Sequence, residues 1–450
     1  MNSSIKRFLL LRSLLALPPH DAGEAVKHFS AVAPHFFVCV IVLCAGHAGA
    51  AAEVPAALAT RPPTVAVIPL ANQSADPALD WIGIGLQETL TWDLRRLFDV
   101  YVVDLQRLVQ RTKHLPTQLA VLMPGELAAL GAQVGVDIFV GGEYRRAGHQ
   151  LNINLYLLDA ARQQFIGTQA FSSPIAQVMP QASQALLAMM QSPSAMLPFR
   201  APPQIPRAKS PPPSALAARA HGLAAVSEAL LGKGFDSLKT ALSWFRQAVQ
   251  DDPTDGESWY RLGEALTHAA EYEDARQALT RALDIARAEG NRILEIATLN
   301  QIGDSLILQG RGTEAEPHFV RALSMARPSK DQVGEMLALH GIGSVQHQRG
   351  EHALAQSSLE QALQLAYSIR DRGAQAKLLN HLGVLAIIFG EYARARQHFE
   401  QAVVMAQAIG DRTIERAGLN NTGVIALRQG EYREARSVFE KVLQITRFLG

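Results

Sequence analysis

The chain has 450 residues, and its 42 basic and 41 acidic side chains leave a formal charge of +1. This length is enough for two or three domains, and the balanced charge gives no reason to expect binding to nucleic acid or to an anionic membrane surface. Cys39 and Cys44 are the only cysteines, which excludes a disulfide framework and a cysteine-based zinc site.

Residues 1–52 are predicted to be a signal peptide or a membrane anchor with a preceding extension. The run from Phe36 to Ala52 has an apolar core of about eleven residues, shorter than the roughly 20 that span a bilayer and typical of a signal peptide. Because the run begins far from Met1, we expect translation to start near Val26. The expected location is periplasmic, after export; the alternative is an uncleaved segment 36–52 that anchors the protein in the inner membrane.

Residues 61–191 are predicted to form a small α/β domain, a mixed sheet covered by helices. Dense apolar runs and alternating apolar and polar residues indicate strands, and apolar residues at helical spacing indicate helices. The order β-α-β-α-α-β-β-β-α predicts a single layer of sheet. The predicted elements are strand 64–70, helix 76–98, strand 100–103, helices 105–110 and 124–135, strands 137–145, 150–159 and 163–172, and helix 175–190.

Short phrases of this domain carry a family resemblance. They are Val67-x-Pro69-Leu70-x-Asn72, Gly83-x-Gly85-Leu86-x-Glu88, Gly135-Val136-Asp137-x-x-x-Gly141-Gly142-Glu143, and Gly148 followed by Asn154, Leu157, Asp159 and Ala160. With the element order, they resemble the TolB N-terminal-like domain, which implies a partner-binding or sensory role without catalysis. Gly83 and Gly85 lack the third glycine of a dinucleotide-binding loop, so we expect them to allow close packing of helix on sheet.

Residues 192–213 contain a proline at about every third position, which predicts a semi-rigid, solvated linker and a domain boundary.

Residues 214–450 repeat with a period of 40. The repeat positions are glycine (263, 303, 343, 383, 423), alanine twelve residues later, and leucine or phenylalanine four residues after that. Such a period indicates stacked repeats, and a helical glycine, which costs about 1 kcal/mol relative to alanine, indicates close approach of a partner helix. A second glycine, as at Gly390, suits a left-handed cap of the first helix.

These repeats resemble the tetratricopeptide repeat (TPR). Trp259-x-x-Leu262-Gly263 matches its opening signature, and the long unit is similar to that of kinesin light chains. The resemblance implies an all-α superhelical solenoid, here of about six helix pairs, whose first helices line a concave groove.

Two sets of residues, here called ladders, recur at fixed positions of these first helices and are the candidate peptide-binding residues. The first ladder lies three residues before each repeat glycine, and the second lies one residue after it. Asparagine can pair with both N–H and C=O of a peptide, and the resemblance to kinesin light chains implies this role; the alternative is that the asparagines hold neighbouring helices together. Because the second ladder changes from acidic to apolar, we expect a bound segment with a basic or polar end. The candidates are Tyr260, Asn300, His340, Asn380 and Asn420, and Glu264, Asp304 and Ser344.

No catalytic residue set and no cofactor motif is recognised. Gly232-Lys233-Gly234 does not complete a phosphate-binding loop. The histidines of the repeats fall on different helix faces, so we expect no metal site. The last helix carries exposed apolar residues, which suggests self-association or a continuation beyond Gly450.

The sequence therefore predicts a non-enzymatic, exported interaction scaffold that binds a peptide or protein in its TPR groove. The alternative is the accessory or sensory part of a bacterial signalling protein, associated with a cyclase or kinase, that lacks its catalytic domain.

Overall fold

The computed structural model describes residues 62–74, 76–98, 100–191, 211–233 and 235–449. The predicted signal segment, 1–52, and most of the predicted linker, 192–210, lie outside these residues. Within the part described, none of the helices has the length and apolar character needed to cross a membrane.

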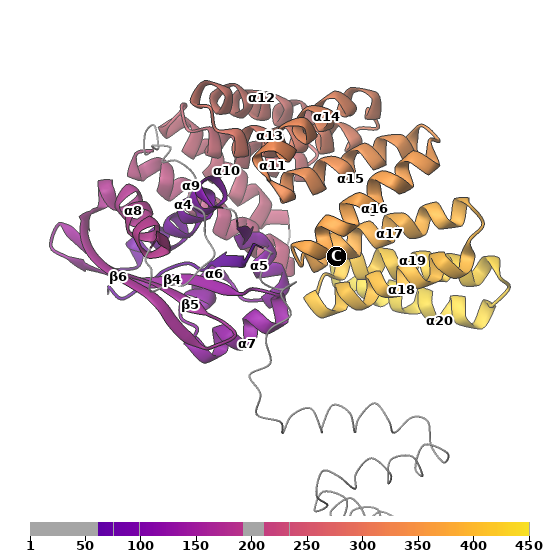
Figure 1. Cartoon of the computed structure of the whole chain (residues 1–450), viewed down its shortest axis with the longest axis horizontal. Coiled ribbons are helices and arrows are strands. Elements are labelled where there is room, and N and C mark those ends of the chain that lie inside the picture. Colours follow the sequence, from indigo (N-terminus) through magenta and orange to yellow (C-terminus); the bar gives the residue numbers. More distant parts are fainter. Residues whose placement is uncertain (1–61, 75, 99, 192–210, 234, 450) are drawn as a thin grey trace, which may run out of the picture. The chain divides into compact units, whose positions relative to one another are not determined.

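The first folded region follows the predicted succession of strands and helices and confirms the mixed α/β class. The additions to the prediction are short: helix α6 (Figure 1), strand β2 and two 3-10 turns. The elements are β1 (Thr64–Val67), β2 (Ala71–Asn72), η2 (Pro77–Leu79), α4 (Trp81–Leu97), β3 (Tyr101–Val103), α5 (Leu105–Thr112), α6 (Pro116–Ala120), α7 (Pro124–Val134), β4 (Ile138–Ala147), β5 (Gln150–Asp159), β6 (Gln164–Pro174), η3 (Ile175–Gln177) and α8 (Val178–Gln191).

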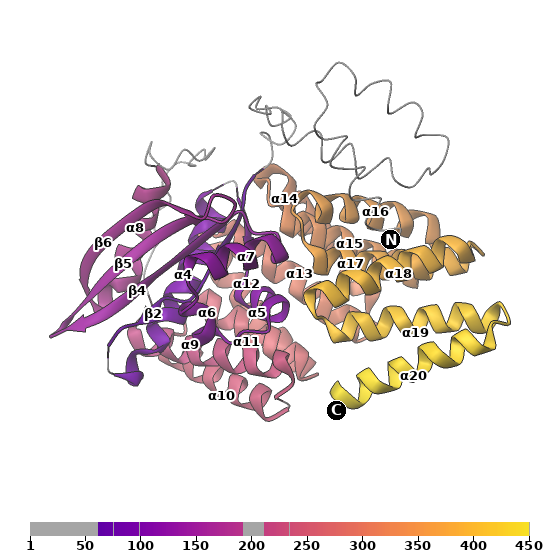
Figure 2. The same cartoon turned by 90° about the horizontal axis from the view of Figure 1, so that it is seen from below.

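The sheet has the order β3-β1-β4-β5-β6, with β2 beside β4. Strand β1 is parallel to β3 and β4, so that Val65 pairs with both Val102 and Ile138. Strands β4, β5 and β6 form two antiparallel hairpins, as predicted. Helices α4 and α8 pack against each other and on the sheet, and α7 contacts β4 (Figure 2).

Helix α4 is buried on nearly all sides, and this was not predicted. Every residue from Trp81 to Leu94 is buried, including Gln87, Glu88 and Asp93. One side of α4 packs on the sheet, and another packs against α9 (Pro213–Glu228), the first helix of the C-terminal region. Among the polar residues of α4, Glu88 is buried against the repeats, where it pairs with arginines of α9 and α11.

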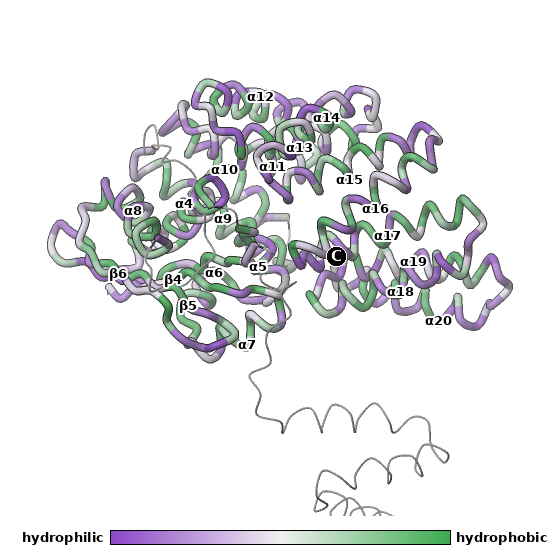
Figure 3. Tube along the Cα trace, in the orientation of Figure 1, coloured by the Kyte–Doolittle hydropathy of each residue, from purple (hydrophilic) through white to green (hydrophobic). Residues whose placement is uncertain are grey.

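The C-terminal region consists of helix pairs stacked in chain order, and hydrophobic and hydrophilic stretches alternate along them (Figures 1 and 3). This confirms the predicted run of helices. The described elements are α9, the π-helical turn η5 (Ala229–Lys233), α10 (Phe235–Asp251), α11 (Gly256–His268), α12 (Tyr272–Glu289), α13 (Arg292–Leu308), α14 (Gly312–Ser329), α15 (Gln332–Gln348), α16 (His352–Ser368), α17 (Arg372–Ile388), α18 (Tyr392–Ile409), α19 (Arg412–Arg428) and α20 (Tyr432–Leu449).

The repeated glycines lie where two helices of a pair approach closely. A Cβ atom at Gly303 would come within 2.5 Å of Cζ of Phe319, and a Cβ atom at Gly383 within 2.5 Å of Cε1 of Phe399. The later glycine, as at Gly390 with φ of 77°, ends the first helix in the left-handed region. Both expectations for these glycines are confirmed. At Gly83 the helix also approaches another backbone closely, because a Cβ atom there would lie 2.2 Å from the carbonyl oxygen of Leu70, in the segment between β1 and β2.

A buried ion-pair network joins α4 to the first repeat helices. Glu88, 2% exposed, lies 2.8 Å from Nε of Arg219 in α9 and accepts a 2.9 Å hydrogen bond from Nε of Arg261 in α11. Arg219, 1% exposed, also pairs with Asp255 at 2.6 Å and Glu257 at 3.1 Å. Burial alone would raise the pKa of Glu88, but Arg219 and Arg261 outweigh burial and hold the pKa below its ordinary value.

Helix α5 makes a second set of contacts, further along the repeats. Arg107 and the hydroxyl of Tyr101 both donate to the carboxylate of Asp371, which is 1% exposed and caps α17 by accepting from the backbone N–H of Ala374 at 3.0 Å. Gln106 donates to Glu264 in α11 at 3.4 Å. The α/β domain is therefore held to α9 and α11 through α4, and to α11 and α17 through the β3–α5 segment.

We expect Glu88→Gln to lower the free energy of unfolding by about 3 kcal/mol, because a buried ion pair that loses one partner leaves uncompensated charge. Urea denaturation followed by circular dichroism at pH 7 measures this. The difference from wild type should shrink as the pH falls below the ordinary glutamate value of 4.5, because the stabilisation by a carboxylate with a lowered pKa is lost as that carboxylate is protonated.

The matched control is Glu273→Gln, which breaks an exposed pair with Arg276 in α12. Exposed pairs contribute little, so its denaturation midpoint should equal that of wild type. Equal midpoints for Glu88→Gln and Glu273→Gln would show that the buried network does not stabilise the fold.

Candidate functional site: a pocket between the α/β domain and the repeat groove

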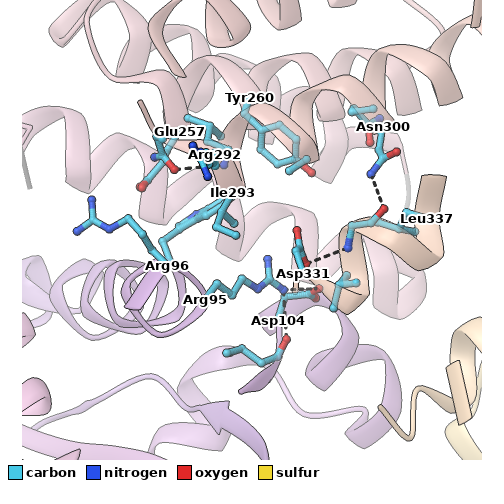
Figure 4. Close-up of a pocket in the computed structure, with 18 of the residues that line it drawn as sticks. Arg95, Arg96, Asp104, Glu257, Tyr260, Arg292, Ile293, Asn300, Asp331 and Leu337 are labelled. Carbon is cyan, nitrogen blue, oxygen red and sulfur yellow. Dashed lines mark hydrogen bonds and ion pairs between the residues drawn. The ribbon is translucent and has the colours of Figure 1, made fainter. Parts of the chain in front are cut away.

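A pocket of about 910 Å³ lies between the α/β domain and the first helices of the repeats. One wall is formed by α4, β3 and α5, and the other by α11, α13, the start of α15 and Lys377 of α17. A smaller pocket of about 80 Å³ shares Arg107, Leu337 and Lys377 with it and extends toward α17. In Figure 4, Arg95 from α4 and Tyr260, Asn300 and Asp331 from the repeats lie around the larger pocket.

The structure brings four of the predicted groove residues into this pocket: Tyr260, Asn300, Glu264 and Asp304. His340 lines the smaller pocket. Ser344, Asn380 and Asn420 line neither of the two pockets. The candidate residues therefore lie in two different environments. Some line a pocket beside the α/β domain, and the others line neither pocket.

Tyr260 packs against the α/β domain. Its ring meets that of Trp92 in α4 edge to face, with 6.0 Å between ring centroids, and the guanidinium of Arg261 lies 5.5 Å from the Tyr260 centroid. Burial raises the pKa of the Tyr260 hydroxyl. In the described part of the chain, no group is hydrogen-bonded to this hydroxyl, which leaves it available to a ligand.

Asn300 joins two neighbouring repeats. It is 2% exposed, and its Nδ2 donates to the carbonyl oxygen of Gly334 in α15 at 3.1 Å. Asp331 accepts from the backbone N–H of the same glycine at 2.9 Å. This contact is the structural role considered as the alternative. The Oδ1 atom of Asn300 is buried and has no hydrogen-bond partner among the residues described.

The other two ladder asparagines differ from Asn300. Asn380 accepts from Nδ2 of Asn421 at 3.0 Å, which again links neighbouring repeats, and Asn420 is exposed. The hydroxyl of Ser344 donates to the carbonyl oxygen of His340 at 2.9 Å, one turn earlier in α15. Peptide contact by these residues stays a prediction.

The two acidic residues of the second ladder differ in their partners: Glu264 is paired, and Asp304 is not. Glu264 is paired with Arg261 at 2.9 Å and accepts from Gln106. Asp304 is partly buried and has neither an ion pair nor a hydrogen bond with the described residues. Burial raises the pKa of Asp304 to about 7, and the nearby ammonium of Lys377 offsets only part of the effect of burial. Asp304 is therefore poised to change charge near neutral pH.

Four histidines of the repeats lie closer together than expected. The ring centroids of His340 and His381 are 5.7 Å apart, those of His381 and His347 5.4 Å, and those of His347 and His352 5.5 Å. The sequence did not predict that His340 and His381, one repeat apart, lie in ring contact. Burial lowers the pKa of His340 to about 3 and that of His381 to about 4. No group of three or more histidine, cysteine, aspartate or glutamate residues in the described ranges is arranged to hold a metal ion.

The sequence did not predict that the α/β domain forms one wall of the pocket. Arg95 donates to the carbonyl oxygen of Val102 at 3.2 Å and pairs with Asp104 at 3.6 Å, and Arg96 donates to Asp93 at 3.3 Å. The available signal in the sequence was the set of polar residues in α4, to which no role was assigned. Nothing in their spacing indicates that repeat helices lie opposite them.

Asp304→Asn is expected to raise the melting temperature clearly more at pH 8 than at pH 5. The carboxyl of Asp304 binds a proton more tightly in the folded protein (pKa about 7) than at its ordinary value of 3.8, so stability falls as the pH rises from about 4 to about 7. Asparagine removes this loss. Differential scanning calorimetry at both pH values measures it.

Asp284→Asn, on the exposed side of α12, is the control and should show no such dependence on pH. A melting temperature of Asp304→Asn at pH 8 equal to or below that of wild type would contradict the assignment of Asp304 as a buried, unpaired carboxyl.

Comparison with known proteins supports the repeat assignment. Family models of the tetratricopeptide repeat match residues 236–295, 294–368 and 374–447. The matched residues do not include the α/β domain, so its similarity to the TolB N-terminal domain stays a prediction. A search of curated protein sequences finds no match.

Solved structures resemble parts of the chain at low similarity. A Rap protein complexed with competence and sporulation factor has a TM-score of 0.42 and 13% identity, and the match covers 54% of this chain and 77% of that one. A Rap conjugation gene regulator of plasmid pLS20, in complex with the Phr* peptide, has a TM-score of 0.42 and 18% identity over 52% of this chain and 63% of that one.

A signal transduction ATPase with a tetratricopeptide repeat sensor from Pyrococcus horikoshii has a TM-score of 0.44 and 12% identity, and the match covers 61% of this chain and 40% of that one. These similarities assign no function. The 40-residue period, the helix pairs and the family matches agree: most of residues 236–447 is made of tetratricopeptide repeats.

Proposed function

We propose that this protein is a non-enzymatic interaction protein that holds a segment of a partner polypeptide in its TPR groove, beside the α/β domain. The observation that carries the proposal is the pocket of about 910 Å³ on the first helices of the repeats. Ligand pockets of a few hundred to 1,000 Å³ are typically found at domain junctions. Four residues predicted for peptide contact line this one.

The polar groups of the pocket suit a polypeptide. The hydroxyl of Tyr260 can donate or accept, and the carboxyl of Asp304 accepts when ionised; neither is used by the described parts of the chain. Ile293, Ala297 and Leu337 add apolar surface to the same wall. A polypeptide segment offers both kinds of group: its backbone N–H and C=O groups would meet the polar groups of the pocket, and its apolar side chains would meet the apolar surface.

The proposal is tested by replacing Gln301 with a photo-crosslinking amino acid in the full chain. Gln301 lies in α13 and lines the pocket. Irradiation in cells should give covalent adducts at residue 301, and mass spectrometry should identify them as segments of another polypeptide.

Gln277, exposed on α12 and not part of the pocket lining, is the matched control and should give few adducts. Equal adducts at both positions would indicate nonspecific contact, and adducts at Gln277 alone would place the partner outside the pocket. Either result would reject the groove as the binding surface.

We also propose that the protein is exported to the periplasm after cleavage of its signal segment, as the run from Phe36 to Ala52 suggests. N-terminal sequencing of the protein recovered from the periplasmic fraction should give a first residue close to Ala52. A mature protein that begins upstream of residue 45, or that stays in the membrane fraction, would favour the anchored alternative.

A further inference from the structure

We propose that the pocket binds a cationic group of the ligand, an amine or a guanidinium, with Asp304 as its counter-ion. This inference rests on the proposed function and specifies which chemical group the groove recognises. The shared chemistry has three sources in a polypeptide: the α-amino group, a lysine side chain and an arginine side chain.

Asp304 differs from the other carboxylates of the pocket. Those of Asp104, Asp255, Glu257 and Glu264 are paired with arginines. Those of Asp252 and Asp331 accept backbone hydrogen bonds, and Glu289 is also engaged. Among the described residues, only Asp304 of the acidic lining has no hydrogen bond and no ion pair. A partly buried carboxylate without a partner lowers stability, which fits a role in binding.

A second, independent feature lies one turn away. Asn300 precedes Asp304 by four residues in α13, so both side chains lie on one face of the helix. Asn300 is 2% exposed, and its Oδ1 has no hydrogen-bond partner within the described structure. Two oxygen acceptors without donors on one helix face suit a ligand rich in N–H groups. An ammonium or guanidinium supplies N–H groups and positive charge together.

The third feature is aromatic. Tyr260 of α11 lines the same pocket, and its hydroxyl has no described partner. A cation close to an aromatic ring is attracted by the quadrupole of the ring. The apolar residues Ile293, Ala297 and Leu337 would contact the methylene groups of a lysine or arginine side chain.

A cationic ligand competes for Asp304 with the positively charged groups of the protein that lie near it. Lys377 of α17 is exposed and acts on Asp304 electrostatically, and no ion pair joins it to the described residues. His340 of α15 is neutral near pH 7, because burial lowers its pKa to about 3. Other charged residues that line the pocket and are already engaged include Glu264 of α11, Asp331 before α15, Arg95 of α4, and Asp104 and Arg107 around α5.

The proposal makes two opposite predictions for variants. Asp304→Asn removes the counter-ion with almost no change of shape and should abolish the preference for cations. Lys377→Gln removes a competing positive charge and should strengthen binding of cations. A merely structural role of these residues would not produce effects of opposite sign.

The test uses the full chain in equilibrium dialysis with four equimolar pools of hexapeptides, quantified by mass spectrometry. Three pools are acetylated and amidated and carry one lysine, one arginine or one norleucine at varied positions; the fourth has a free α-amino group and no charged side chain. We expect at least one cationic pool to be retained about tenfold more than the norleucine pool at pH 8. The pool that is retained identifies the source of the cation.

Retention should fall about tenfold from pH 8 to pH 6, because the ionised fraction of a carboxyl with a pKa of about 7 falls from about 0.9 to about 0.1. Arg276→Gln, on the exposed side of α12, is the matched control and should behave as wild type. Circular dichroism confirms that each variant is folded.

Equal retention of all four pools, or an unchanged cation preference in folded Asp304→Asn, would overturn the cation site and leave peptide binding standing. Retention of no pool by the wild-type chain, together with no adducts at residue 301, would reject the proposed function itself.

Discussion

The arrangement of the two domains depends on a buried carboxylate, Glu88, between two arginines from the repeats. Charges removed from water need partners of opposite charge, and Glu88 pairs with Arg219 and Arg261 only when α4 lies against α9 and α11. The network therefore fixes which surface of the α/β domain meets the repeats. It also explains why a helix with many polar residues is buried.

Because α4 is fixed in this way, the following β3–α5 segment reaches across the first helices of the repeats. Arg107 and Tyr101 meet Asp371 at the start of α17, and Gln106 meets Glu264. The groove is therefore not an open concave surface along its whole length. Its first part becomes a pocket with one wall from each domain, and a ligand in that pocket would contact both.

Residues at equivalent positions of different repeats have different environments. Asn300 and Asn420 hold the same position in their repeats, but Asn300 bonds to Gly334 beside the α/β domain and Asn420 is exposed. Glu264 and Asp304 form a similar pair, the first neutralised by Arg261 and the second unpaired. Equal spacing along a solenoid gives equal backbone positions, whereas the environment of each side chain is set by what lies opposite.

The repeat architecture follows from sequence alone, because each unit buries its apolar face against its neighbours in sequence. The 40-residue period and the Gly303–Phe319 and Gly383–Phe399 contacts are local in this sense. The succession of strands and helices along the α/β domain was also largely predicted from apolar periodicity, whereas the order of the strands in the sheet was not. The docking of α4 on the repeats and the isolation of Asp304 required the tertiary structure. They depend on contacts such as Glu88–Arg219 and Tyr101–Asp371, between residues far apart in the chain, for which no periodic pattern exists.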